Sequence, residues 1–243
     1  MSESLDSVGL IARTVDCCAL VDQIIAGDAE RQIPALPIAG LRLAVPERVW
    51  TDDLDPIVAR AYERTLLRIE AAGARVIRRE TTSLNSLEPI EQSGILIGPE
   101  AYATHRRLLS QHGDQYDPRV RWRMQPFENT SAADYIDAVR CRRDAIEWFD
   151  REVYEFDAVL APTVKVVPPR FDELEDDDEY RRKNAIVRRN AAFVNLVDGC
   201  ALSVPCHAPD ELPMGLMIIG RRNADSHILA VGMAVERALS SVA

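Results

Sequence analysis

The sequence has few lysines and no pair of adjacent glycines. Lys165 and Lys183 are the only two lysines among its 243 residues. A nucleic-acid surface needs clustered basic side chains facing phosphates, and the formal net charge of -10 argues against that class of partner. No apolar run approaches the roughly 20 residues of a membrane-spanning helix. We therefore expect neither a nucleic acid nor a membrane as a partner.

The cysteines also exclude a class of protein. There are five of them, an odd number without the regular spacing of a disulfide framework. Cys200 and Cys206 do not have the spacing of zinc ligands, and we expect no metal and no cofactor. Residues Met1–Asp6 are polar and acidic, unlike the start of a secretory signal. Reduced thiols and the lack of a signal predict a cytoplasmic protein.

A packed core is nevertheless expected. Hydrophobic residues make up 47% of the sequence and charged residues 28%, which is typical of globular proteins. The chain shows no internal repeat and no Gly- or Ser-rich linker that would separate domains. We predict a single domain over residues 1–243.

The most hydrophobic stretch lies near the C-terminal end. Cys200–Cys206 and Pro213–Gly220 are short apolar runs bounded by Gly, Pro or Asp, which is typical of buried strands. The polar segment His207–Leu212 between them contains a proline and predicts a turn. Together they predict an antiparallel hairpin at the heart of a larger sheet.

An earlier segment predicts parallel strands. Leu41–Val45 and Arg75–Arg79 have the pattern of short strands, and Asp53–Ala72 between them has apolar residues at helical spacing. Asp52 or Asp53 is expected to cap this helix. A strand, a helix and a strand in under forty residues predict a βαβ unit with a right-handed crossover.

The rest of the chain alternates helices and connections. Leu10–Ala26 is apolar almost all round, which predicts a buried helix. The other expected elements are helices over Gly98–His112, Ser131 to about Tyr154, Tyr180–Val197 and Asp225–Ser240, a strand over Phe156–Thr163, a polar connection over Tyr116–Pro126 and a loop over Lys165–Asp178. We thus predict an α/β fold with a mixed β-sheet flanked by helices.

Several motifs in order resemble the amidase signature family. Ser4–Gly27 (SLDSVGLIARTVDCCALVDQIIAG) is close to S-x-D-x-x-G-P-x-A-R-T-V-x-D-x-A-L, and Phe156–Thr163 (FDAVLAPT) matches F-D-x-L-x-x-P-T. Asn195, Gly199 and the SVPC and LPMGLMIIG runs resemble the C-terminal end of the family's pattern. The resemblance extends over nearly the whole chain.

The resemblance implies a mechanism and a place within the family. The family hydrolyses amides with a serine nucleophile, a second serine on a cis peptide bond and a neutral lysine, while a Gly-Gly-Ser loop holds the oxyanion. In the family Ser4–Gly27 follows this catalytic core, so the chain resembles the C-terminal half of an amidase. Lys165 follows the A-P-T strand end, and Lys183 lies in a solvated basic cluster. We expect neither lysine to stand on a buried strand end with serines nearby. We therefore assign no catalytic residue.

The resemblance also implies a substrate-binding group. The family's pocket is bordered by the loop after A-P-T and by the helix before the F-x-N motif, which correspond here to Thr163, Arg188, Asn190 and Asn195. By this analogy Arg188 contacts the polar end of the substrate. The alternative is that Arg188 is a surface charge of a helix and that the asparagines cap backbone groups.

Two functions of different classes follow. In the first, the chain is the substrate-side half of an enzyme for a small-molecule linear amide, inactive alone because the triad lies upstream of Met1. In the second, it is a non-catalytic fragment or subunit. Its open sheet edge and apolar helix would then bind a separately encoded N-terminal half, another partner or a second copy of the chain.

Overall fold

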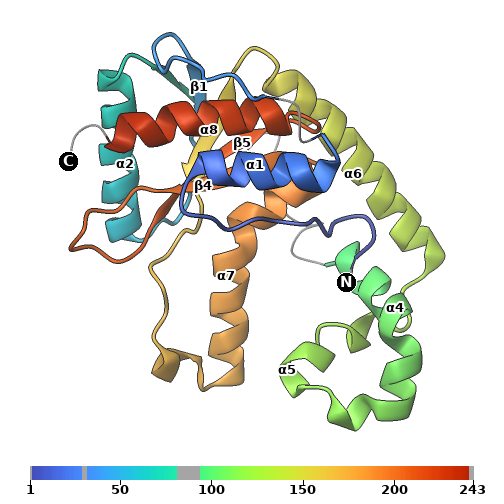
Figure 1. Ribbon diagram of the computed structural model, residues 1–243. Coiled ribbons are helices and arrows are strands. Elements are labelled where there is room, and N and C mark those ends of the chain that lie inside the picture. The colour runs from blue at the N-terminus through green and yellow to red at the C-terminus, as the bar shows by residue number, and fades with distance from the viewer. Residues whose placement is uncertain (1, 29–31, 81–93, 241–243) are drawn as a thin grey trace.

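A five-stranded mixed sheet lies at the centre of the computed structural model, which describes residues 2–28, 32–80 and 94–240 (Figure 1). Its strand order is β2-β1-β3-β5-β4. The strands are β1 (Arg42–Pro46), β2 (Arg75–Arg79), β3 (Ala158–Pro162), β4 (Cys200–Pro205) and β5 (Gly215–Gly220). The predicted mixed α/β sheet is confirmed.

The βαβ unit is present as predicted. β1 and β2 pair in parallel from Arg42 opposite Arg75 to Pro46 opposite Arg79, and α2 (Pro56–Ala71) connects them. The predicted helix cap was wrong by two residues or more. Asp55 caps α2 instead, because its side chain accepts a 2.7 Å hydrogen bond from the Ile57 N–H.

The hairpin forms, but only one of its strands is central. β4 and β5 pair antiparallel over their whole length, and β5 also pairs with β3. β4 is an edge strand in which Val204 alone is fully buried. The prediction that both strands lie at the heart of the sheet is therefore wrong for β4. Its apolar composition does not reveal which strand of a hairpin has a second neighbour.

Helices cover both faces of the sheet. One layer combines α2, α8 (Asp225–Ser240) and part of α1 with strand residues such as Leu160, Leu216 and Ile218. The other combines α6 (Ala132–Glu152) and α7 (Asp177–Leu196) with the alternate strand residues Val159 and Met217. This alternation is the two-residue period of a strand. The sheet therefore separates two apolar layers, one on each of its faces.

The first helix departs from the prediction. α1 spans Val15–Ala26 and begins after Thr14, whose hydroxyl accepts a 3.2 Å hydrogen bond from the Cys17 N–H. Only Val15 and Ala19 are buried, so the described part of the chain leaves most of this apolar helix uncovered. Three large apolar side chains, Leu20, Ile24 and Ile25, are more than half exposed.

A helical arm extends beyond the sheet. It comprises α4 (Ile97–His112) and α5 (Pro118–Arg121), which occupies part of the predicted polar connection (Figure 1). Arg119 Nε lies 2.7 Å from Asp177 Oδ1, and Arg123 donates a 3.1 Å hydrogen bond to Asn184 Oδ1. These contacts join the arm to the N-terminal half of α7.

None of the described helices is both long enough and apolar enough to cross a bilayer.

The central position of β5 leads to a first prediction. Ile218 is fully buried between strands β3 and β4 and beneath the α2 and α8 layer. Ile218→Ala should lower the free energy of unfolding by about 2–5 kcal/mol, because it removes buried methyl groups and leaves a cavity. Urea denaturation measures this loss. Leu67→Ala, on the exposed side of α2, is the matched control and should cost less than about 1 kcal/mol.

Candidate substrate-binding site

Helix α7 presents two of the predicted site residues on one face. Arg188 and Asn195 are seven residues apart, which is two turns of a helix, and Ala191 and Ala192 lie between them. Small alanines leave space beside the helix that larger side chains would fill. The sequence therefore produces a polar residue at each end of a shallow apolar strip.

A cavity lies along this strip. Its volume is about 230 Å³, and both Arg188 and Asn195 line it. The opposite wall comes from the start of α4 and from the N-terminal segment, where Asp6 stands among apolar side chains. The wall residues are Leu5, Asp6, Gly94, Leu96, Ile97 and, on α7, Ala191, Ala192 and Leu196. A site with a cation, an amide, a carboxylate and apolar side chains can hold a small polar molecule.

Asn190 points away from this cavity into the core. Its side-chain amide donates hydrogen bonds to Trp50 O at 3.1 Å and to Pro162 O at 2.7 Å. The Trp50 indole N–H donates in return to Asn190 O at 3.1 Å. No described residue bonds to Asn190 Oδ1. Asn190 therefore joins α7 to the end of β3 and positions the face that carries Arg188.

Thr163 lies in a second group, at the end of β3. Its hydroxyl is 2.6 Å from the hydroxyl of Ser203 on β4, across the start of β5. Gly215 makes this pair possible, because a Cβ there would lie 2.3 Å from Ser203 Oγ and 2.8 Å from Thr163 Oγ1. Sequence reasoning missed Ser203. Its signal was a single hydroxyl within an otherwise apolar strand.

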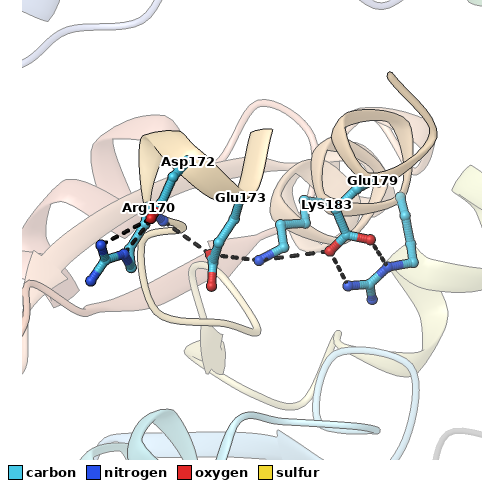
Figure 2. Close-up of polar contacts among 6 residues, drawn as sticks. Arg170, Asp172, Glu173, Glu179 and Lys183 are labelled. Atoms are coloured by element: carbon cyan, nitrogen blue, oxygen red, sulfur yellow. Dashed lines mark hydrogen bonds and ion pairs between the residues drawn. The ribbon is translucent and has the colours of Figure 1, made fainter. Parts of the chain in front are cut away.

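The two lysines occupy different environments. Lys165, three residues beyond β3, is 1% exposed, and its ammonium donates a 2.8 Å hydrogen bond to Asp52 O. Lys165 is therefore buried, but it lies beyond the strand end rather than on it. Lys183 lies on α7, 2.6 Å from Glu173, within a surface network that also contains Glu179 (Figure 2). This network holds the loop before α7 against the first turns of the helix.

Glu100 fixes the wall opposite α7. Its carboxylate accepts hydrogen bonds from the Ser2 hydroxyl at 2.5 Å, the Ser4 hydroxyl at 2.6 Å and the Tyr135 hydroxyl at 2.7 Å. Burial by itself raises the pKa of Glu100, but the hydrogen bonds from these three residues outweigh it and lower the pKa to about 2. The N-terminal segment is thereby tied to α4 and α6, and Leu5 and Asp6 are held at the cavity.

Within the described ranges, no three His, Cys, Asp or Glu side chains are placed to hold a metal ion.

The sequence is similar to a family model and to curated proteins. The sequence model described as Amidase matches residues 1–229. The chain is 32% identical over 245 residues to 2-amino-5-chloromuconic acid deaminase of Comamonas testosteroni, covering 97% of this chain and 52% of that protein. It is 28% identical over 258 residues to an amidase of Pseudomonas putida, covering 98% and 54%. The chain thus spans about half the length of the curated relatives that it matches.

Solved structures agree on the fold. A crystal structure of an amidase superposes with a TM-score of 0.84 at 23% identity, covering 97% of this chain and 54% of that one. One of the subunits of the glutamyl-tRNA(Gln) amidotransferase of Thermotoga maritima superposes with a TM-score of 0.72 at 27% identity, covering 97% and 53%. The second of these proteins is, by its name, a component of an amidotransferase.

The lowered pKa of Glu100 leads to a second prediction. Its folded-state pKa of about 2 lies below the ordinary value of 4.5, so its stabilisation is full above pH 4.5 and is lost as the pH falls toward 2. Glu100→Gln should lower the free energy of unfolding at pH 7 by about 1–3 kcal/mol and flatten the acid limb of its pH dependence.

Urea denaturation at several pH values between 2 and 7 measures both effects. Glu147→Gln, at an exposed position of α6, is the matched control and should reproduce the wild-type curve. A Glu100→Gln curve parallel to that of the wild type would contradict the role assigned to the carboxylate.

Proposed function

Because this chain belongs to the amidase family, we propose that it supplies the substrate-side part of an enzyme that hydrolyses the C–N bond of a linear carboxylic amide. The observation that carries the proposal is the cavity between α7 and the N-terminal segment, lined by Arg188 and Asn195. On this proposal residues 1–243 are one part of a single amidase domain. The free state of all five cysteines supports a cytoplasmic location.

The chemistry proposed for the complete enzyme is acyl transfer to serine. A serine attacks the amide carbonyl, a second serine passes the proton to a neutral lysine, and water hydrolyses the resulting ester. On the resemblance described above, these groups belong to the part of an amidase that precedes the segment resembling Ser4–Gly27. The role we assign to this chain is to bind and orient the substrate beside them.

Arg188 supports an acidic substrate. A guanidinium binds a carboxylate with two parallel hydrogen bonds, and Arg188 stands at one end of the cavity. The relative from Comamonas testosteroni acts, by its name, on an acid. We therefore propose that Arg188 holds a substrate carboxylate and that Asn195 contacts a polar group at the other end. Asn190 positions this arrangement from the buried side of α7, and Thr163 belongs to the separate group with Ser203 at the end of β3.

We further propose a protein partner, the complementary half of an amidase domain. The half-length match to the curated relatives supports it, and so does the likeness to a protein named as one component of an amidotransferase. Pairing of two copies of this chain is the competing assembly. Two polypeptides that together complete the fold would place the catalytic serines and lysine beside the cavity.

The chain alone should not form an acyl-enzyme. It has no adjacent glycines for an oxyanion loop, and Lys183 is engaged by Glu173 and Glu179. Incubation with a fluorophosphonate should leave its intact mass unchanged, whereas an active amidase of the family gains one label. Stoichiometric labelling of the isolated chain would contradict this division of roles.

The role of Arg188 is tested in a chimera that joins this chain to the part of the Comamonas testosteroni relative that it does not match. Arg188→Met should reduce kcat/KM about 10- to 100-fold for amides that carry a carboxylate, because it removes a charged hydrogen bond. Hydrolysis of neutral amides should be unchanged. Arg143→Met, on the exposed side of α6, should affect neither substrate class. An equal loss on both classes would contradict carboxylate binding.

A further inference from the structure

The loops that follow β1 and β3 meet at one point of the sheet. β1 lies between β2 and β3 and is parallel to both, which gives the order β2-β1-β3. In α/β proteins with this order, ligands bind in the crevice outside the carboxyl ends of β1 and β3. Here Lys165, three residues after β3, extends to the loop that follows β1 and is 1% exposed. A cation of the chain itself therefore lies between the two loops.

Lys165 is tied to the loop after β1 through both its side chain and its backbone. Its ammonium donates a 2.8 Å hydrogen bond to Asp52 O, and its carbonyl oxygen accepts a 2.9 Å hydrogen bond from the Asp55 N–H. An ammonium is costly to bury unless hydrogen bonds replace the water that it loses. These two bonds, which run in opposite directions, therefore fix residues 47–55 against the end of β3.

The loop after β1 contains a strained turn. Val49 has a φ of +68°, which a β-branched residue rarely adopts, and its N–H donates a 3.1 Å hydrogen bond to Asp52 Oδ2. Strain of this kind persists only where several contacts hold the backbone in place. Asp52 supplies one such contact, and Lys165 holds Asp52. In this conformation the next residue, Trp50, is directed into the core, where it is 1% exposed.

Trp50 connects this loop to helix α7. Its indole N–H donates to Asn190 O at 3.1 Å, and its carbonyl oxygen accepts a hydrogen bond from the Asn190 amide at 3.1 Å. Arg188, two residues before Asn190, lines the cavity on the open side of the helix. A series of direct contacts thus leads from Lys165 through the loop and the Trp50–Asn190 pair to the helix that carries Arg188.

We propose that Lys165 is a positioning residue of the substrate-binding site, which sets the orientation in which α7 presents Arg188 to a substrate carboxylate. This inference deepens the proposed function and rests on it. Lys165 is buried away from the cavity, so it acts on substrate selection through the loop, Trp50 and Asn190. A lysine that only stabilised the fold would affect all substrates equally, and this difference makes the proposal testable.

Lys165→Met tests this role in the chimera with the part of the Comamonas testosteroni relative. Methionine keeps an unbranched apolar side chain and removes the ammonium. KM for amides that carry a carboxylate should rise about 3- to 30-fold, because a contact outside the site changes binding by a limited amount. The kcat values and the KM of neutral amides should stay within about twofold of the wild type. Combining Lys165→Met with Arg188→Met should add no further loss, since both act on the same interaction.

The other lysine of the chain provides the matched control. Lys183→Met removes the same charge from α7, where Lys183 contacts Glu173 and Glu179 at the surface, and it should leave KM for both substrate classes unchanged. Trp50→Phe removes the indole donor and keeps an aromatic ring, so it should reproduce the selective rise in KM even if Lys165→Met does not fold. An equal rise for both classes, or additive losses in the double variant, would overturn the proposal.

Hydrogen exchange in the isolated chain measures the link to α7 without any hydrolysis. Exchange of the Trp50 indole N–H, followed by NMR, should be at least about tenfold faster in Lys165→Met, because the loop that holds the indole loses a contact. The Ile218 amide, at the centre of the sheet, reports global unfolding and should accelerate less. Lys183→Met should change neither rate. Equal acceleration at both positions would assign Lys165 to general stability and overturn the proposal.

Exchange and hydrolysis test the two proposals separately. Selective acceleration of the Trp50 indole, in a chain whose chimera hydrolyses no amide, would uphold the positioning of α7 and contradict the proposed function. A chimera that carries Lys165→Met and hydrolyses both substrate classes with the KM of the wild type would uphold the proposed function and overturn the role of Lys165.

Discussion

The reciprocal hydrogen bonds between Trp50 and Asn190 hold the candidate site together. Both side chains are buried, and they bond to each other's backbone carbonyl groups while Asn190 also bonds to Pro162. Trp50 in turn packs edge-on against Phe149 of α6 and Phe193 of α7. A buried hydrogen-bonded pair is costly to break, so α7 has one orientation relative to the sheet. That orientation places Arg188 on the open side of the helix.

The opposite wall of the cavity depends on a second polar centre. Glu100 draws together Ser2 and Ser4 of the N-terminal segment and Tyr135 of α6. Its carboxylate keeps its charge because these hydroxyl groups replace the water that burial removes. Two groups of residues therefore hold the walls of the cavity in place. One is the hydrogen-bonded pair of Trp50 and Asn190 within an apolar layer, and the other is the charged carboxylate of Glu100 with its hydroxyl partners. Between them the polar groups of the site face a space that a ligand can enter.

Much of the architecture follows from local sequence patterns. The parallel unit of β1, α2 and β2, the β4–β5 hairpin and helix α8 appear where periodicity and turn residues place them. Ser131 caps α6 as expected, accepting a 3.1 Å hydrogen bond from the Asp134 N–H. The errors about burial concern the neighbours of an element rather than the element itself. An apolar strand and an apolar helix predicted burial, yet β4 is an edge and α1 is largely uncovered, because burial depends on what packs against a segment.

The candidate site was likewise predictable from the sequence only in part. The order of residues is enough to put Arg188 and Asn195 on one face of α7, since seven residues make two helical turns, and to put Asn190 on another side. It is not enough to show that Asn190 bonds to the end of β3 or that Thr163 meets Ser203 across Gly215, which the packed fold establishes. Helical spacing is a local property that neighbouring residues specify. Contacts between strands and loops depend on sheet order and register, which arise only when distant segments pack together.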